Sequence, residues 1–289
     1  MLQPNIETFL ACEAAYEEAE IVLYGAPFDS TTSFRPGARF GPRAIRSESW
    51  GLENYSPYQD RDLSDYRIFD AGDQELCFGD PKLALADLEA RAGQIADDGK
   101  IPFLLGGEHL VTLAPVRALA RRYPDLRLIH FDAHTDLREE YLGTPLSHAC
   151  VIRRCWELLG DGRITQFGIR SGDREEWRWG RDHVKTHPFF VDMDALEETV
   201  RAIGEKPVYV TVDLDVLDPS VFSGTGTPEP GGVSFDELRR AVTYLGERAR
   251  IVGCDVNELA PMLDATGAST AAACKLVREM LLAIAGRKR

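Results

Sequence analysis

Residues 126–136 read LRLIHFDAHTD, an apolar run that leads directly into three residues of metal-binding type. The run Leu126–Phe131 is typical of a buried strand. If the chain stays extended beyond it, Asp132, His134 and Asp136 lie two residues apart and share one face of the strand. Asp and His also gather in loops, because they tolerate turns and solvate well. The segment therefore predicts a buried strand, and it raises the hypothesis of a metal site at the strand's end.

Apolar runs and helical periodicity alternate along the rest of the chain. We predict strands at Ile21–Gly25, Arg67–Asp70, Ile101–Leu105, Leu126–Phe131, Ile164–Ile169, Phe189–Val191, Val208–Asp213 and Ile251–Cys254. We predict helices at Leu83–Ala96, Ala149–Leu159, Ala195–Ile203 and Ser269–Ile284. Two more helices are expected to end near Ile45 and near Arg122. A further helix is expected to begin at the S-x-x-E capping box of Ser234. This alternation predicts an α/β fold, with three α/β/α layers around a mostly parallel sheet of about eight strands.

Composition limits the class of protein. The chain has 289 residues, of which 44% are hydrophobic, and a net charge of −14. Without a linker or an abrupt composition shift, residues 1–289 suit one α/β domain with an N-terminal arm at 1–18. The negative charge argues against nucleic acid or an anionic membrane as a partner. Acidity keeps a protein soluble, and it also suits a small cationic substrate.

The six cysteines show neither a CxxC pair nor the spacing of a disulfide framework, so we expect reduced thiols. Residues 1–7 lack the basic and apolar regions of a signal peptide. The chain also lacks an apolar run near the roughly 18 residues of a membrane span. We therefore expect a cytoplasmic protein.

Polar clusters follow four of the predicted strands: GGEH at 106–109, DAHTD at 132–136, DLD at 213–215 and DVNE at 255–258. The carboxyl ends of parallel strands meet at one edge of a sheet, where ligands bind, so we expect these clusters to lie together. Asp213 and Asp215 are again two residues apart, and an extended chain would place both on one face.

The candidate ligands are two histidines and four aspartates without a thiolate, a set that suits Mn²⁺ better than Zn²⁺. Four ionised aspartates repel one another, and two divalent ions would balance their charge. Such a pair of ions lowers the pKa of a shared water and presents hydroxide at neutral pH. Glu258, three residues after Asp255, could pair with a guanidinium group, with a helix cap or a surface salt bridge as the alternative.

These motifs together resemble the ureohydrolases, the family that includes arginase and agmatinase, along nearly the whole chain. The resemblance extends from Gly25–Asp29 and Arg35–Arg43 to Glu258–Pro261. Residues 106–109 look like the family's first signature, residues 132–136 like its second and Asp213–Pro219 like its third. The resemblance implies an arginase-like fold, two Mn²⁺ ions per chain and a homo-oligomer, either a trimer or a hexamer.

The resemblance also implies a role for each candidate residue. One manganese would be held by His109, Asp132, Asp136 and Asp213. The other would be held by His134, Asp132, Asp213 and Asp215, with Asp132 and Asp213 bridging the two ions. Glu258 would bind the guanidinium group of the substrate, and His148 would shuttle protons. The implied reaction is hydroxide attack on the guanidinium carbon, a tetrahedral intermediate, and loss of an amine with release of urea.

The segment before His148 bears on the substrate. Arginase-type chains carry Asn and Ser there to grip the carboxylate of arginine, whereas Leu137–Pro145 lacks that pattern, and we expect Glu139 and Glu140 to repel a carboxylate. The early loop, between Gly25 and Arg43, and the loop Ser223–Gly232 look more like those of agmatinase. The family has a glycine directly after the shuttle histidine, where this chain has Ala149. The shape of this loop, and with it the substrate specificity, is therefore not determined by the resemblance. We expect agmatine as the substrate, and guanidinobutyrate, proclavaminate and arginine remain alternatives.

Two other classes of function fit the sequence less well. A non-catalytic relative that binds metal or a partner would have no chemical need for the complete ligand set with His148 and Glu258. A dinucleotide-binding enzyme would need GxGxxG after the first strand, where Tyr24–Pro27 stands instead. The arginines of Arg35–Arg43 predict a structural or subunit-contact role rather than anion binding. His183 and His187 lie outside the motifs and predict surface or packing roles.

Overall fold

The computed structural model describes residues 7–287, and its centre is a parallel sheet. The strands are β1 (Ile21–Gly25), β4 (Ile68–Asp73), β5 (Ile101–Leu105), β6 (Arg127–Phe131), β7 (Ile164–Ile169), β8 (Lys185–Pro188), β9 (Pro207–Asp213) and β10 (Arg250–Asn257). They lie in the order β4-β1-β5-β10-β9-β6-β7-β8, and each described pairing in this sheet is parallel. The predicted eight-stranded α/β fold is confirmed. The prediction that residues 1–7 are not a signal peptide concerns mainly residues 1–6, which lie outside the described residues.

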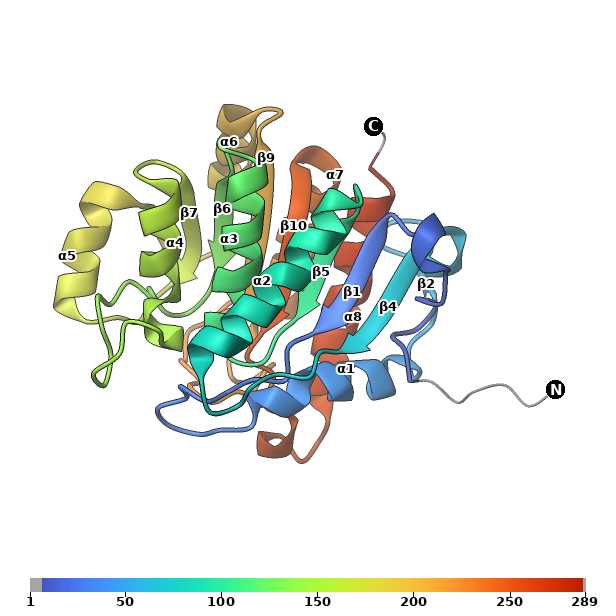
Figure 1. Cartoon of the computed structure of the whole chain (residues 1–289), viewed down its shortest axis with the longest axis horizontal. Coiled ribbons are helices and arrows are strands. Elements are labelled where there is room, and N and C mark those ends of the chain that lie inside the picture. Colours follow the sequence, from blue (N-terminus) through green and yellow to red (C-terminus); the bar gives the residue numbers. More distant parts are fainter. Residues whose placement is uncertain (1–6, 288–289) are drawn as a thin grey trace.

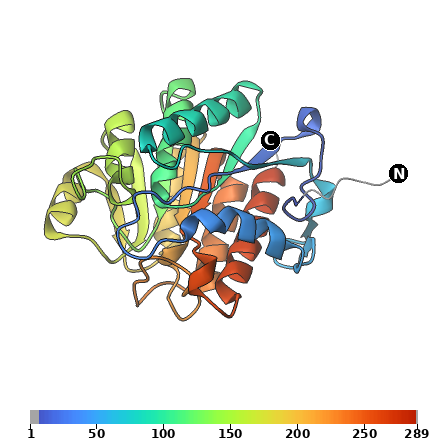
Figure 2. The same ribbon diagram turned by 60° about the horizontal axis from the view of Figure 1, so that its bottom comes forward.

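Helices cover both faces of the sheet and complete three layers (Figure 1). On one face lie α2 (Pro81–Asp97), α3 (Leu113–Arg122) and α4 (Val151–Leu159). On the other lie α1 (Gly41–Ser49), α6 (Met193–Ile203), α7 (Phe235–Arg248) and α8 (Ala268–Ala285). Figure 2 shows α1 beside α8 beneath the sheet, with α2 on the opposite side. The remaining helix, α5 (Arg174–His183), immediately precedes edge strand β8.

Short elements connect these layers. A separate two-stranded antiparallel sheet is formed by β2 (Tyr55–Ser56) and β3 (Arg61–Asp62). The 3₁₀ helices are η1 (Tyr16–Glu18), η2 (Ala38–Phe40), η3 (Leu63–Asp65), η4 (His109–Thr112), η5 (His148–Cys150), η6 (Leu214–Val216) and η7 (Pro261–Leu263). The predicted capping box is present at the start of α7, where Glu237 N–H donates to Ser234 Oγ at 3.3 Å and Ser234 N–H donates to Glu237 Oε2 at 2.8 Å.

The strands read as nearly continuous apolar runs because both of their faces are buried. In β6, Leu128 packs in the core beneath α2, α3 and α4, whereas Ile129 and Phe131 pack in the core on the other face. Apolar residues of α2 and α7 complete these two cores, as helices with one buried stripe do. The hydrophobic pattern therefore sets the layers.

The structure corrects three predictions of secondary structure. The eighth strand is Lys185–Pro188, and Phe189–Val191 lies beyond it. Phe189 has a left-handed φ of 70° and is half exposed. The prediction was wrong because it took an apolar residue as a sign of a buried strand. Helix α5 was missed, because its mostly polar face gives a weak apolar signal. The last strand also continues to Asn257, so Asp255 belongs to the strand and not to a loop after it.

The strand order places the four polar clusters side by side. β5 and β6 are consecutive strands of the chain along this edge, yet β10 and β9 lie between them in the sheet. The loops after these strands therefore meet at the point where the chain direction across the sheet changes, as is usual for ligand sites in such folds. A functional site is therefore expected at the centre of the carboxyl edge of the sheet.

A buried ion pair joins α1 to the sheet. Arg46 Nε lies 2.8 Å from Asp70 Oδ2, and the two side chains are 3% and 0% exposed. Asp70 also accepts the N–H groups of Phe9 and Gly72, and Arg46 has a second partner in Asp73. This pair anchors the helix that follows the early loop of the candidate site.

We predict that Asp70→Asn lowers the free energy of unfolding by about 3 kcal/mol, since it leaves the buried charge of Arg46 without its main partner. The matched control is Asp97→Asn, which removes one partner of an exposed pair with Arg122 and should change stability by less than about 1 kcal/mol. Urea unfolding of the three proteins measures the difference. Equal losses in the two variants would contradict the importance of the buried pair.

Candidate metal centre

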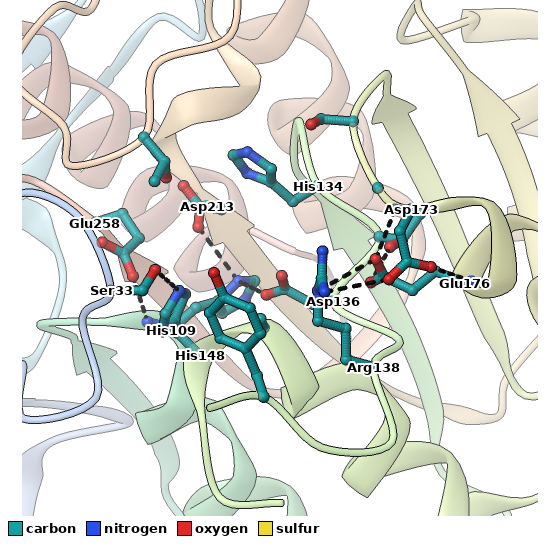
Figure 3. Close-up of a pocket in the computed structure, with 16 residues that line it drawn as sticks. Ser33, His109, His134, Asp136, Arg138, His148, Asp173, Glu176, Asp213 and Glu258 are labelled. Carbon is teal, nitrogen blue, oxygen red and sulfur yellow. Dashed lines mark hydrogen bonds and ion pairs between the residues drawn. The ribbon is translucent and has the colours of Figure 1, made fainter. Parts of the chain in front are cut away.

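A cavity of about 370 Å³ opens at the carboxyl edge of the central strands. Six of the residues predicted to form the site line it: His109, His134, Asp136, His148, Asp213 and Glu258. Figure 3 shows these side chains facing a common space, although they come from distant parts of the sequence. The other two, Asp132 and Asp215, are buried and contact the lining histidines. The structure therefore brings all eight together.

Turns, not an extended strand, make the aspartates converge. β6 ends at Phe131, and the Oδ1 of Asp132 then accepts the N–H of His134 at 2.6 Å. Asp136 adopts a left-handed φ of 51°. After β9, the Oδ1 of Asp213 accepts the N–H of Asp215 at 2.9 Å as η6 begins. The prediction that alternate residues share a strand face was wrong at both places, because each aspartate folds the chain through its own side chain.

A first group of ligand atoms surrounds His109. Its Nδ1 lies 3.1 Å from Asp132 Oδ2, 3.2 Å from Asp136 Oδ2 and 3.3 Å from Asp213 Oδ2. The atom is buried and has no hydrogen-bond partner within residues 7–287. Nε2 of the same ring is 2.8 Å from Thr211 Oγ1. One imidazole nitrogen and three carboxylate oxygens thus face one point, as the ligands of a divalent cation do.

The charges of this group are strongly unfavourable by themselves. Burial, followed by repulsion from Asp132, raises the pKa of Asp136 to about 7. Burial and the neighbouring carboxylates of Asp215 and Asp132 raise the pKa of Asp213 well above its usual range. Burial favours a neutral His109, but the attraction of the nearby carboxylates of Asp132, Asp136 and Asp213 outweighs that and raises its pKa. The donor set fits a cation that would stabilise all of the carboxylates in their ionised form.

A second group forms around His134. Its Nδ1 lies 3.0 Å from Asp215 Oδ2 and 3.5 Å from Asp132 Oδ1. Asp132 therefore presents one oxygen to each histidine, which is the arrangement expected of a bridging carboxylate. Asp213 directs Oδ2 to the first group and uses Oδ1 to accept a backbone N–H. Its bridging role stays a prediction.

The two remaining residues close the cavity. Burial lowers the pKa of His148 to about 4, so its ring is neutral at pH 7, and its Nε2 is 3.4 Å from Ser33 Oγ. Glu258 has a left-handed φ of 67°, and its Oε1 accepts the N–H of His109 at 2.7 Å. Burial and repulsion from Glu108 raise the pKa of the Glu258 carboxyl well above its usual range.

The early loop holds His148 in place. Glu108 is fully buried and accepts the N–H of Thr31 at 2.9 Å and its hydroxyl at 2.7 Å. The Thr31 hydroxyl in turn accepts the N–H of His148 at 3.1 Å. Arg35 donates from Nε to the carbonyl of Gly226 and from Nη2 to that of Thr225. These contacts support the predicted structural role of the arginine-containing loop.

Several cavity residues were not predicted. Ser33, Arg138, Tyr141, Asp173 and Glu176 line it, whereas the exposed Glu139 and Glu140 are not part of its lining. The expected repulsion of a carboxylate by those two glutamates stays a prediction, and it would have to act from outside the lining.

The acidic residues at this side of the cavity are Asp173 and Glu176, and Figure 3 shows both beside Arg138, away from Glu258. Arg138 Nη1 is 3.1 Å from Asp173 Oδ2, and its Nε is 3.4 Å from Glu176 Oε2. Asp173 and Glu176 form a D-x-x-E capping box at the start of α5. That pattern was the available signal in the sequence.

The two histidines outside the motifs pack as predicted. His183 stacks on Trp179 with ring centroids 4.2 Å apart and binds Asp161 at 2.7 Å. His187 stacks on Phe167 with centroids 4.8 Å apart.

Comparison with known proteins gives consistent results. A sequence model of the arginase family matches residues 19–283. The agmatinase of Bacillus subtilis (strain 168) is 46% identical over 277 residues, which cover 96% of each chain. The N(1)-aminopropylagmatine ureohydrolase of Thermococcus kodakarensis is 41% identical over 252 residues, 84% of each chain. The crystal structure of the agmatine ureohydrolase of Thermoplasma volcanium superposes with a TM-score of 0.89 at 36% identity, covering 97% of this chain and 94% of that one.

We predict that Asp132→Ala abolishes binding of divalent metal at both positions, since the residue presents an oxygen to each group. Equilibrium dialysis with Mn²⁺, followed by metal analysis, measures the number of ions bound. Asp194→Ala, at an exposed position of α6, serves as the control and should bind as the unmodified protein does. Two ions retained by the Asp132 variant would contradict the bridging assignment.

Proposed function

The chain belongs to the arginase family, and we propose that it hydrolyses agmatine to putrescine and urea with two bound Mn²⁺ ions. The observation that carries the proposal is the buried Nδ1 of His109, which faces three carboxylate oxygens without a hydrogen-bond partner in the described chain. The agmatinase relatives, 44% to 46% identical over 96% of the chain, support the substrate.

The ligand atoms of the cavity would hold the two metals. We assign one ion to His109, Asp132, Asp136 and Asp213, and the other to His134, Asp132, Asp213 and Asp215. Their oxygen-rich chemistry supports Mn²⁺. When bound, the pair would supply hydroxide at neutral pH and stabilise the negative charge that develops in the reaction.

Glu258 would bind the guanidinium group. One of its oxygens accepts the N–H of His109, which orients the carboxylate and leaves Oε2 for the substrate. A guanidinium offers parallel N–H donors that match a carboxylate, and its positive charge would offset the repulsion between Glu258 and Glu108. This interaction would place the reacting carbon beside both ligand groups.

His148 would move a proton during expulsion of the amine. Its imidazole is neutral at pH 7 and lines the same cavity, so it has a lone pair available to accept a proton and pass it on. The neighbouring hydroxyl of Ser33 and the ring of Tyr141 limit where the imidazole can turn.

The far side of the cavity supports a cationic tail. Arg138 is paired with Asp173 and Glu176, so the positive charge nearest that side is already neutralised. A substrate carboxylate would meet these two acidic groups, whereas an ammonium group would not be repelled. A longer substrate is the second candidate, because one relative is named as an N(1)-aminopropylagmatine ureohydrolase.

Three further proposals concern the domain organisation, the oligomeric state and the location of the protein. We propose that the whole chain forms one catalytic domain, which the single large sheet supports. A homo-oligomer, trimer or hexamer, rests on the family resemblance, whereas a cytoplasmic location rests on the six free cysteines, which suit a reducing compartment. Within residues 7–287, none of the helices combines the length and apolar content that crossing a bilayer requires. A non-catalytic relative stays the alternative class.

We predict that the Mn²⁺-loaded protein releases urea from agmatine with a higher kcat/KM than from guanidinobutyrate, the amidino derivative of proclavaminate, arginine or N(1)-aminopropylagmatine. A colorimetric urea assay over this substrate panel ranks them. The same protein after chelation is the control and should be inactive. Two bound Mn²⁺ ions without hydrolysis of any guanidine would favour the non-catalytic alternative.

We predict that Glu258→Gln keeps both metals and lowers kcat/KM for agmatine by about 10- to 100-fold, because a neutral amide loses the charge-assisted contact with the guanidinium. Glu139→Gln is the matched control, since this exposed glutamate lies outside the cavity lining and should leave the kinetics unchanged. Steady-state kinetics with metal analysis measures both quantities. Unchanged kcat/KM in the Glu258 variant would remove the residue from substrate binding.

A further inference from the structure

A row of polar side chains crosses the sheet beneath the candidate metal centre. Direct register across five neighbouring strands pairs Thr186 with Gln166, Gln166 with His130, His130 with Thr211, and Thr211 with Asp255. The last four are fully buried. Residues in register on parallel strands point to the same face, here the face that α3 and α4 cover. A polar row inside a sheet buried on both faces costs free energy, so it requires an explanation.

Gln166 holds the ring of His130 in one orientation. Its Nε2 lies 2.8 Å from the carbonyl oxygen of Thr135 and 3.0 Å from His130 Nδ1, while its Oε1 accepts the hydroxyl of Thr186 at 3.0 Å. A carbonyl oxygen only accepts, so the contact with Thr135 identifies the amide nitrogen. An amide nitrogen only donates, and His130 Nδ1 must therefore be the acceptor.

The proton of the neutral His130 ring consequently lies on Nε2. That atom is 2.7 Å from Asp132 Oδ2 and donates to it. The other oxygen of Asp132 accepts the N–H of His134 at 2.6 Å. Each oxygen of the carboxylate thus has one fixed donor, and each keeps a lone pair for the ligand group on its side.

We propose that His130, kept in one tautomer by Gln166, is a positioning residue that holds the carboxylate of Asp132 between the two metal positions. The inference rests on the dinuclear centre proposed above. His130 also lies close enough to His109 and Asp132 to be considered a metal ligand itself. A nitrogen that carries a proton has no lone pair for a metal, so the hydrogen bonds favour positioning over ligation.

The test compares His130→Phe, which removes the donor, with His130→Gln, whose amide nitrogen can replace Nε2 as a donor. Calorimetric titration with Mn²⁺ gives the affinity and the number of ions, and electron paramagnetic resonance reports the exchange coupling between bridged ions. We expect His130→Phe to weaken Mn²⁺ binding by about 10- to 100-fold and to reduce the coupling. We expect His130→Gln to restore most of both, with the same number of ions.

Gln166→Met provides an independent variant should the phenylalanine substitution prevent folding. It leaves His130 in place but frees its tautomer, and we expect Mn²⁺ affinity to fall by about 2- to 10-fold. Urea unfolding of each metal-free variant separates this effect from a general loss of stability, which would lower the unfolding midpoint without changing the exchange coupling.

The outcomes distinguish the two proposals. If the unmodified protein binds fewer than two Mn²⁺ ions, the dinuclear centre itself is overturned. If it binds two and the His130 and Gln166 variants keep its affinity and coupling, only the positioning role is overturned. If both His130 variants bind one ion fewer, His130 is a ligand and the positioning role is likewise wrong.

Discussion

The structure depends on the crowding of buried carboxylates at the carboxyl edge of the sheet. Asp132, Asp136, Asp213 and Asp215 are each less than a tenth exposed, and two imidazoles lie among them. Burying like charges so close together is unfavourable unless cations compensate them. The surrounding fold therefore has to hold the carboxylates rigidly against their own repulsion.

Central position and short-range turns provide that rigidity. The four strands that deliver the polar residues are neighbours in the middle of the sheet, packed on both faces by helices. Where β6 and β9 end, Asp132 and Asp213 accept N–H groups from the residues two positions later. The same carboxylates that form the candidate centre thus shape the loops that carry them.

The residues that we propose to favour a cationic substrate lie apart from this centre. Figure 3 shows Arg138 beside Asp173 and Glu176, away from Glu258; Arg138 lies on the segment after β6, and the two acidic residues lie at the start of α5. Loops of this kind vary without disturbing the sheet, whereas a change at His130 or Gln166 would reach the centre through the sheet itself. Relatives that share the fold are accordingly named for different guanidino compounds.

The sequence by itself determined the layers and the residue types of the site. Strands such as Ile101–Leu105 and Ile164–Ile169 were predicted to the residue, because apolar runs report burial along the chain. The tertiary structure alone decided that His130 stands opposite Gln166, that Glu139 lies outside the cavity, and that Phe189 leaves the sheet. Register between strands and the direction of a loop depend on contacts between residues far apart in the chain, and local patterns carry no record of them.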